Sequence, residues 1–229
     1  MKTILVTGAS SGIGAETVRY LSKCGYNIVM VARNIERLKE VAFQVDKDSL
    51  IIPYDLRDLS SIETIFKKCE ENELVLDGMV HAAGIVQDTP IRTNDIEIMQ
   101  EVTTIHYYAF VELSKYFSKK RYSNDGSSIV AISSMASVLH EKGMCTYSAA
   151  KSAMDAAVGV MSKEFCNRSI RVNSILPRMV NTPMITNLGY LDSNSVKEAL
   201  DPIQIAYLVE FLLSDKSKHI TNAHIPVGG

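Results

Sequence analysis

Tyr147 and Lys151 carry the side chains in this chain whose types and spacing best suit chemistry. They stand four positions apart at the start of an alanine-rich run that predicts a helix over 148–165. On a helix this spacing puts both side chains on one face, where an ammonium can lower the pKa of a phenol from its usual value of about 10. The pair would then suit a proton donor working near neutral pH. The same spacing is common on solvated helix faces, so other residues of the chain must show whether this pair is catalytic.

Short apolar runs alternate with amphipathic ones along the whole sequence. The expected strands are 3–6, 27–32, 50–54, 78–81, 128–133, 171–175 and 224–227, and the expected helices are 13–24, 35–44, 61–71, 95–121, 148–165 and 202–214. This alternation predicts an α/β fold, a doubly wound Rossmann-type three-layer sandwich with a seven-stranded parallel sheet. With no linker or repeat in sight, residues 1–229 are expected to form one domain.

Three helix starts carry capping signals. The pairs are Ser60 with Glu63, Asn94 with Glu97, and Asp201 with Pro202. The first two resemble capping boxes, and the third is a cap followed by a first-turn proline.

Composition narrows the class of protein. Apolar residues make up 46%, charged residues 22%, and the formal net charge is -2, which gives no reason to expect nucleic acid or an anionic membrane as partner. No apolar run approaches the roughly 20 residues of a membrane helix, and the start reaches a glycine too soon for a signal peptide. The cysteines Cys24, Cys69, Cys145 and Cys166 show no metal-ligand spacing. We therefore expect a cytoplasmic protein with reduced thiols and no metal.

A glycine-rich loop follows the first expected strand and opens the first helix. It runs from Thr7 to Gly14 with the spacing G-x-x-x-G-x-G. Glycines allow a tight turn and close backbone approach, and a helix N-terminus offers free N–H groups to a pyrophosphate. This position between strand and helix favours dinucleotide binding.

The glycine loop together with Tyr147 and Lys151 resembles the compact, single-domain branch of the short-chain dehydrogenase/reductase family, in the style of 3-oxoacyl-[acyl-carrier-protein] reductases. The likeness covers essentially the whole chain. It implies hydride transfer between a nicotinamide cofactor and a carbonyl or alcohol, a small-molecule or acyl-thioester substrate, and a homodimer or homotetramer. The cofactor-binding residues it implies are Gly8, Ser10, Ser11, Gly12, Ile13, Gly14, Arg33, Asn34, Asp55, Leu56, Ala82, Ala83, Gly84, Tyr147, Lys151, Pro177, Val180 and Thr182.

The end of the second expected strand bears on cofactor choice. An acidic residue there would accept hydrogen bonds from an adenosine ribose, but this segment has no acid and one arginine, Arg33. Arg33, helped by Ser10, could hold a 2′-phosphate, so we expect NADP(H) rather than NAD(H). The alternative for Arg33 is an ordinary solvated charge. Asp55 resembles the residue that meets the adenine amino group, and could equally cap the following turn.

The resemblance also supplies a partner for the tyrosine. Ser134 lies thirteen residues before Tyr147, the family spacing for the hydroxyl that orients the substrate, and Ser133 is the near miss. Ser134 and Tyr147 would bind the carbonyl oxygen, and Tyr147 would give up its proton. Lys151 would stabilise the phenolate and bind the nicotinamide ribose.

Three residues depart from the family pattern. Ala82 stands where an asparagine usually helps to stabilise the sheet. His106 replaces an asparagine that holds a water in a proton relay; it could hold that water, carry a proton at physiological pH, or be a buried structural histidine. Arg178 replaces a glycine and either points to solvent or enters the substrate cleft to pair with an anion.

Only eighteen residues separate Thr182 from Asp201, which is short for the segment that closes over substrate in the family. The apolar candidates for the pocket wall, in this segment and just before it, are Met179, Met184, Ile185, Leu188, Tyr190 and Leu191. The sequence thus predicts an NADPH-dependent carbonyl reductase. The alternatives are a non-catalytic dinucleotide sensor or scaffold, which the departures support, and a sugar-nucleotide-modifying relative, for which the chain is short.

Overall fold

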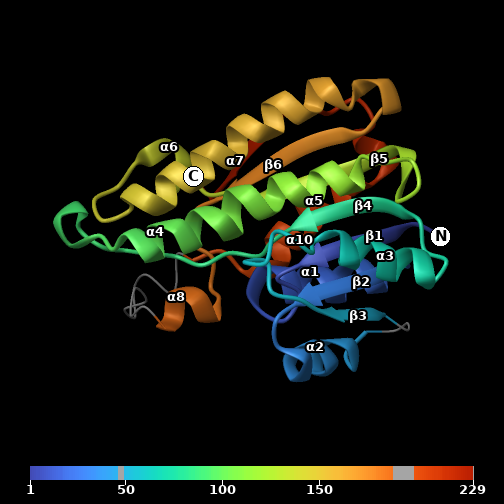
Figure 1. The fold of residues 1–229 in the computed structure, drawn as a ribbon, viewed down its shortest axis with the longest axis horizontal. Coiled ribbons are helices and arrows are strands. Elements are labelled where there is room, and N and C mark those ends of the chain that lie inside the picture. The colour runs from blue at the N-terminus through green and yellow to red at the C-terminus, as the bar shows by residue number, and fades with distance from the viewer. Residues whose placement is uncertain (46–48, 188–198, 229) are drawn as a thin grey trace.

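A parallel sheet of seven strands forms the centre of the computed structural model, which describes residues 1–45, 49–187 and 199–228 (Figure 1). The strand order is β3-β2-β1-β4-β5-β6-β7, and every neighbouring pair is parallel. The strands are Thr3–Thr7 (β1), Asn27–Ala32 (β2), Leu50–Pro53 (β3), Leu76–His81 (β4), Ser123–Ile132 (β5), Arg171–Pro177 (β6) and His224–Val227 (β7). The predicted fold class is confirmed.

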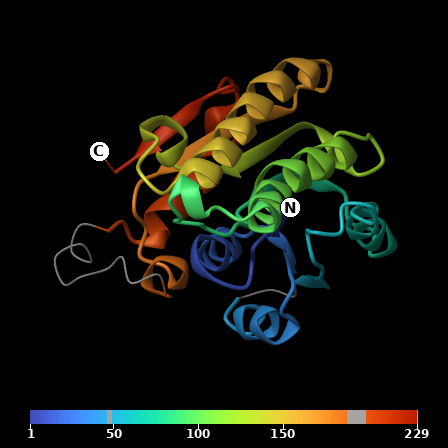
Figure 2. The ribbon, with the colours of Figure 1, turned by 60° about the vertical axis from the view of Figure 1, so that its left-hand side comes forward.

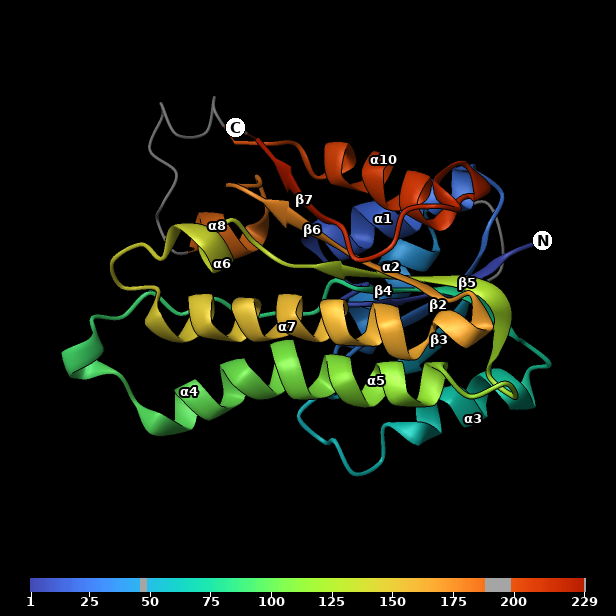
Figure 3. The ribbon, with the colours of Figure 1, turned by 90° about the horizontal axis from the view of Figure 1, so that it is seen from above.

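Helices cover both faces of this sheet (Figures 2 and 3). Their bounds are Gly12–Lys23 (α1), Ile35–Ala42 (α2), Glu63–Glu71 (α3), Ile96–Thr103 (α4), Ala109–Phe117 (α5), Ala136–Leu139 (α6), Cys145–Glu164 (α7), Pro183–Asn187 (α8) and Pro202–Leu213 (α10), with short 3₁₀ turns at Ile91–Thr93 (η1), Cys166–Arg168 (η3) and Asp215–Ser217 (η4). One apolar core joins α3, α5 and α7 to the sheet, and the other joins α1, α2 and α10 to its opposite face.

Successive side chains of a strand point alternately into the two cores. In β1, Leu5 enters the core under α3, α5 and α7, whereas Ile4 and Val6 enter the other one. All three are fully buried. Burial of such a side chain contributes roughly 1.5–3 kcal/mol, so the near-continuous apolar runs that suggested strands also hold the three layers together.

The helix starts show where local signals hold and where they do not. Asp201 caps α10 in a capping box with Gln204, with Pro202 in the first turn, as the sequence indicated. The prediction at Ser60 is wrong, because the Asp58 carboxylate accepts hydrogen bonds from Ser60 and α3 begins later.

The cap of α4 is displaced by one residue. Asp95 rather than Asn94 accepts a hydrogen bond from the Glu97 N–H, at 2.7 Å. The Asn94 amide instead donates to the Thr146 hydroxyl, across to α7.

Two long elements differ from the prediction. The helix expected over 95–121 is interrupted by a π-helical turn, η2 (Thr104–Tyr108), which separates α4 from α5. Helix α7 begins at Cys145, so Tyr147 lies in its first turn. Such π turns are frequent at functional sites, and η2 carries His106.

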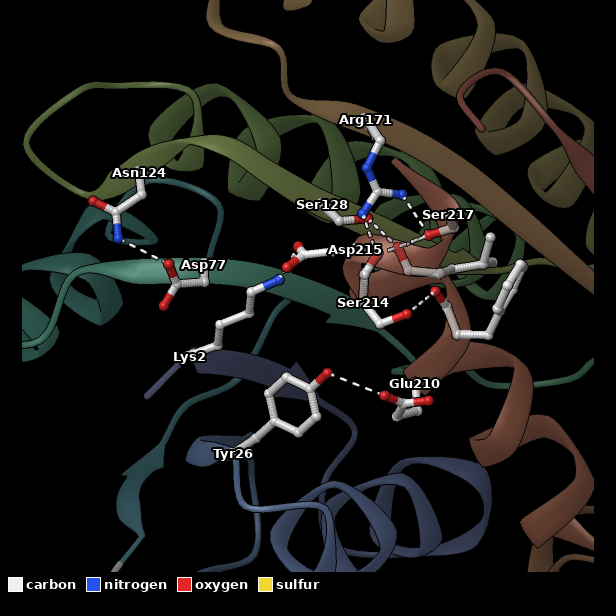
Figure 4. Close-up of polar contacts among 12 residues, drawn as sticks. Lys2, Tyr26, Asp77, Asn124, Ser128, Arg171, Glu210, Ser214, Asp215 and Ser217 are labelled. Atoms are coloured by element: carbon white, nitrogen blue, oxygen red, sulfur yellow. Dashed lines mark hydrogen bonds and ion pairs between the residues drawn. The ribbon is translucent and has the colours of Figure 1, made fainter. Parts of the chain in front are cut away.

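Polar contacts tie the elements together at the end of the sheet where the strands begin (Figure 4). The Arg171 guanidinium at the start of β6 donates to the Ser217 hydroxyl at 2.9 Å, and Lys2 forms an ion pair with Asp215. The strand order of the sheet reverses between β1 and β4. At the carboxyl ends of the strands, such a reversal forms the crevice in which open α/β sheets bind ligands.

Candidate active site

The glycine loop between β1 and α1 fits tightly against the end of β4. Gly8 has φ +67, and a Cβ there would lie 2.7 Å from the Ala83 nitrogen and 2.8 Å from the Ala82 carbonyl. A Cβ at Gly14 would lie 2.2 Å from the Gly8 carbonyl oxygen. Both positions therefore need glycine, Gly8 for its backbone angle and Gly14 for helix–strand packing.

A cleft with a volume of about 260 Å³ opens beside this loop. Of the residues predicted to bind cofactor or substrate, it is lined by Gly8, Ser10, Ser11, Gly12, Ile13, Arg33, Asn34, Asp55, Leu56, Ala82, Ala83, Gly84, Thr182 and Met184. It is also lined by Ala32, Arg37, Tyr54, Ile85, Ile105 and Pro183, which sequence reasoning did not single out. The lining comes from the carboxyl ends of β1 to β4 and from the segment after β6. The glycine cradle and free helix N-terminus fit the diphosphate of a dinucleotide.

Two arginines stand at the β2 end of the cleft. Arg33 and Arg37 are both exposed, and the Arg37 N–H donates to the Asn34 side chain, which caps α2 at 2.8 Å. Arg37 was missed, although its place in the first turn of the helix that follows Arg33 was a usable signal. The pair gives this end of the cleft a positive charge.

Asp55 also faces its own turn. Its carboxylate accepts hydrogen bonds from the Arg57 N–H at 3.0 Å and from the Arg57 guanidinium. These bonds hold the pKa of Asp55 below its ordinary value. The turn-capping role that the sequence left open is therefore present, while Asp55 still lines the cleft.

His81 compensates for the alanine at position 82. Thr7 Oγ1 accepts a hydrogen bond from the Ala83 N–H and lies 3.0 Å from His81 Nδ1, and His81 Nε2 lies 3.1 Å from the Ile105 carbonyl oxygen. A carbonyl only accepts, so Nε2 carries the hydrogen and Nδ1 accepts from Thr7. Burial lowers the pKa of His81 to about 3 and keeps it neutral. This chain of bonds joins β1, β4 and η2, and sequence reasoning missed it.

The serine, tyrosine and lysine come together at the carboxyl end of β5. Ser134 follows this strand and accepts a hydrogen bond from the Ala136 N–H at 3.1 Å, and its hydroxyl lies near enough to Tyr147 to lower the pKa of that phenol. Lys151 is buried; its Nζ donates to the Ile132 carbonyl at 2.7 Å and lies 5.6 Å from the centre of the Tyr147 ring. Ser133 takes a different role, donating to Asp155.

Burial controls the protonation of this group. It raises the pKa of Tyr147 to about 12, with the Ser134 hydrogen bond acting in the opposite direction. The expectation that Lys151 lowers the pKa of this phenol is not met, because desolvation outweighs the other effects. Burial also lowers the pKa of Lys151 to about 7, opposed by the charge of Asp155.

His106 packs between the tyrosine and the cleft. Its ring stands edge-on to the Tyr147 ring, 5.3 Å between centres, and its Nε2 donates to the Ile85 carbonyl at 2.7 Å. A Cβ at Gly84 would lie 2.3 Å from the ring, so Gly84 leaves room for this histidine. Burial and the charge of Lys151 hold the pKa of His106 well below its ordinary value. Of the alternatives that the sequence left open for His106, these contacts favour the buried, hydrogen-bonded histidine over the one that carries a proton at physiological pH.

The segment after β6 closes one side of the cleft. Val180 is buried and pairs with Leu200, and Thr182 is buried against Gly12. Neither Pro177 nor Val180 lines the cleft wall. Arg178 is exposed, and its backbone N–H donates to the Val227 carbonyl. Of the two alternatives for Arg178, this exposure fits the one in which the side chain points to solvent.

The predicted pocket wall is described only in part. Met184 lines the cleft and Met179 and Ile185 are partly buried. Leu188, Tyr190 and Leu191 lie outside the described residues. Within the described ranges, no group of three histidine, cysteine or acidic side chains could hold a metal ion, and no helix is long and apolar enough to cross a membrane.

Comparison with protein families agrees with this geometry. A family profile described as short chain dehydrogenase matches residues 2–190. A 3-oxoacyl-[acyl-carrier-protein] reductase FabG from Rickettsia conorii is 30% identical over 100% of this chain and 95% of its own length. A 2,5-dichloro-2,5-cyclohexadiene-1,4-diol dehydrogenase LinX from Sphingobium indicum is also 30% identical, with the same coverage.

Solved structures show the same arrangement. A 4-hydroxyisoleucine dehydrogenase complexed with NADH superimposes with a TM-score of 0.89 at 26% identity, covering 100% of this chain and 98% of that one. A dehydrogenase/reductase from Sinorhizobium meliloti 1021 gives a TM-score of 0.91 at 27% identity, covering 99% and 93%.

Proposed function

The chain belongs to the short chain dehydrogenase family of NAD(P)-dependent oxidoreductases, and from this premise we propose that it reduces a carbonyl to an alcohol with NADPH. The substrate class we propose is a 3-oxoacyl thioester or a related small ketone, in the style of its FabG relatives. The observation that carries the proposal is the convergence of Ser134 on Tyr147, which stands one helical turn before a buried lysine.

The cofactor part of the proposal rests on the cleft. The loop from Gly8 to Gly14 would hold the diphosphate, and Arg33 with Arg37 would face the adenosine end. A guanidinium pairs well with a phosphate, and the two residues directly after β2, Arg33 and Asn34, include no acid that could accept hydrogen bonds from a ribose. Both features favour NADPH. The NADH bound to the 4-hydroxyisoleucine dehydrogenase reflects the cofactor site of that protein.

The chain's own residues would divide the work on the substrate. Ser134 and Tyr147 would donate hydrogen bonds to the carbonyl oxygen. At neutral pH a phenol with a pKa of about 12 holds its proton, so Tyr147 would act as the acid in the reductive direction. General acid catalysis of this kind is worth roughly 10²–10⁴-fold.

Two further residues would support the transfer. When bound, the nicotinamide supplies the hydride. The Lys151 ammonium would stabilise the phenolate left on Tyr147 and bind the cofactor ribose. Neutral His106 would hold Ile85 and the edge of the Tyr147 ring in place.

Cofactor preference is tested by calorimetric titration of NADPH and NADH. We expect NADPH to bind more tightly, and Arg33→Ala to weaken NADPH binding by about tenfold, or about 1.4 kcal/mol, with NADH unaffected. Arg92→Ala, which removes an exposed arginine away from the cleft, is the control. Tighter NADH binding that Arg33→Ala leaves unchanged would refute the preference.

Catalysis is tested by following NADPH oxidation with β-keto thioesters, diketones and keto sugars. We expect turnover with at least one β-keto thioester. Tight NADPH binding without oxidation in the presence of any of these carbonyls would favour the non-catalytic sensor instead.

A further inference from the structure

A polar cluster lies beside Lys151, on the face of the sheet that α7 covers. Asp155 stands one helical turn after Lys151, so both side chains lie on the same face of α7. The Asp155 Oδ2 atom accepts a hydrogen bond from the Ser133 hydroxyl at 2.9 Å. The Asp155 Oδ1 atom is buried without a hydrogen-bond partner among the described residues.

The edge strand supplies the other side of this cluster. His224 of β7 places its Nδ1 3.7 Å from the Asp155 Oδ1 atom and 2.7 Å from the Ser174 hydroxyl. Both contacts fall on the same ring nitrogen, so the arrangement is no serine–histidine–aspartate relay. Around the Asp155 carboxylate stand Lys151 from α7, Ser133 from directly after β5, and His224 from β7.

The position of Asp155 relates it to both halves of the active site. Ser133 is the residue before Ser134, so the Ser133–Asp155 bond fixes the end of β5 next to the substrate-facing hydroxyl. Lys151 is buried, and among the residues that the structure describes its ammonium donates to one carbonyl, at 2.7 Å. A buried ammonium is costly unless an opposite charge compensates it. The negative charge of Asp155 acts on Lys151 in that sense.

We propose that Asp155 is a positioning residue for the reaction: its carboxylate compensates the buried Lys151 ammonium from the next turn of α7 and, through Ser133, fixes the strand end that carries Ser134. The role in catalysis rests on the proposed function. The effect on Lys151 does not, because it is a property of the free protein.

The direct test is an NMR titration of the full-length chain labelled with ¹³C at the lysine ε-carbon, with the Lys151 signal assigned by its loss in Lys151→Gln. In the wild type we expect Lys151 to titrate with a pKa of about 7. Asp155→Asn keeps the shape and an acceptor for Ser133 but removes the charge, and should move the midpoint at least about one pH unit lower. Glu164→Gln removes an equal charge from an exposed position on the same helix and should leave it in place.

Three more variants separate the contacts. Ser133→Ala keeps the carboxylate and should leave the Lys151 midpoint where it is. His224→Asn removes the imidazole that faces the same carboxylate, and the shift caused by Asp155→Asn should persist in that background. Asp155→Glu should restore most of the wild-type midpoint. An unchanged midpoint in Asp155→Asn, with thermal unfolding showing a folded protein, would overturn the proposal.

The catalytic role of Asp155 is tested by the pH dependence of kcat, once a carbonyl substrate that the protein reduces has been found. The decline of kcat at high pH should begin at lower pH in Asp155→Asn, as the Lys151 midpoint moves. A uniform loss of kcat at every pH would mean that Asp155 is merely structural. Absence of any turnover in the wild type would instead refute the proposed function and leave the NMR result standing.

Discussion

Two buried cations lie at opposite ends of the sheet, and they differ in what burial does to them. Arg171, where β6 begins, donates to the Ser217 hydroxyl and to the Ser214 carbonyl, and burial lowers its pKa. A guanidinium with an ordinary pKa above 12 nevertheless stays charged at any working pH. Lys151, beside the carboxyl end of β5, has its pKa lowered to about 7. Arg171 therefore stays charged in spite of its burial, whereas burial brings the pKa of Lys151 into the range where the side chain titrates near neutral pH.

The polar side chains near these two cations differ as well. At the amino ends, polar side chains pair with one another across elements, as Figure 4 shows for Lys2 with Asp215 and Asn124 with Asp77. Beside the cleft, His106 Nδ1 and Asp155 Oδ1 are buried without hydrogen-bond partners among the described residues. Unsatisfied buried groups cost stability, and these two lie next to the residues that are proposed to carry the chemistry.

Glycines give the largest expected contrast. Gly8→Ala meets a positive φ and the backbone of Ala82 and Ala83, so we expect the free energy of unfolding to fall by about 2–5 kcal/mol. NADPH binding should weaken as well. Gly126, at the amino end of β5, also has a positive φ but open space around it, so Gly126→Ala should cost only about 1–2 kcal/mol. Urea unfolding measures both, and equal losses would contradict the close fit of the glycine loop.

The arginine gives the next contrast. Arg171→Lys loses the fork that reaches two acceptors at once, so we expect a stability loss of about 1.5–3 kcal/mol in urea unfolding. The kcat for carbonyl reduction should not change. Arg92→Lys, an exposed exchange, serves as the control. A fall in kcat at unchanged stability would remove the distinction between the two ends.

The buried histidines predict how stability depends on pH. An unfolded histidine binds a proton below about pH 6.5, whereas burial lowers the pKa of His81 to about 3 and that of His106 in the same direction. Their stabilising effect is thus complete above pH 6.5 and falls as the pH drops towards 3. At pH 5 His81 should cost about 2 kcal/mol relative to pH 7, and His106 should lower the stability in the same direction.

Denaturant unfolding from pH 7 to pH 5 checks this slope. His81→Asn and His106→Asn should each flatten it, while the exposed His219→Asn should not. Wild-type stability that stays level across this range would mean that the two rings accept protons in the folded protein.

Local signals predicted the fold well. Apolar runs gave the strands, Asp201 and Pro202 gave the start of α10, and the glycine spacing placed the loop that forms the cleft wall. Ser60 failed because Asp58, two residues earlier, competes for the same groups. Such competition is decided by geometry that spacing does not contain.

The contacts around the proposed catalytic residues could not be predicted from the sequence for a similar reason. The hydrogen-bond partner of His106 is the Ile85 carbonyl, twenty-one residues away in the sequence. The π-helical turn η2 has no sequence pattern that would have predicted it. The Lys151–Asp155 spacing was visible, but burial sets the pKa of Lys151, and burial comes from packing of α7 on the sheet.

The central claim is that binding and chemistry reside in separable groups, the glycine cleft and Tyr147 with its neighbours. The most direct test measures NADPH affinity and the kcat for a β-keto thioester side by side in Tyr147→Phe, with the exposed Tyr108→Phe as control. We expect Tyr147→Phe to bind NADPH within about twofold of the wild type and to lose roughly 10²–10⁴-fold in kcat. Turnover that survives in Tyr147→Phe, or NADPH affinity that collapses with it, would contradict the account.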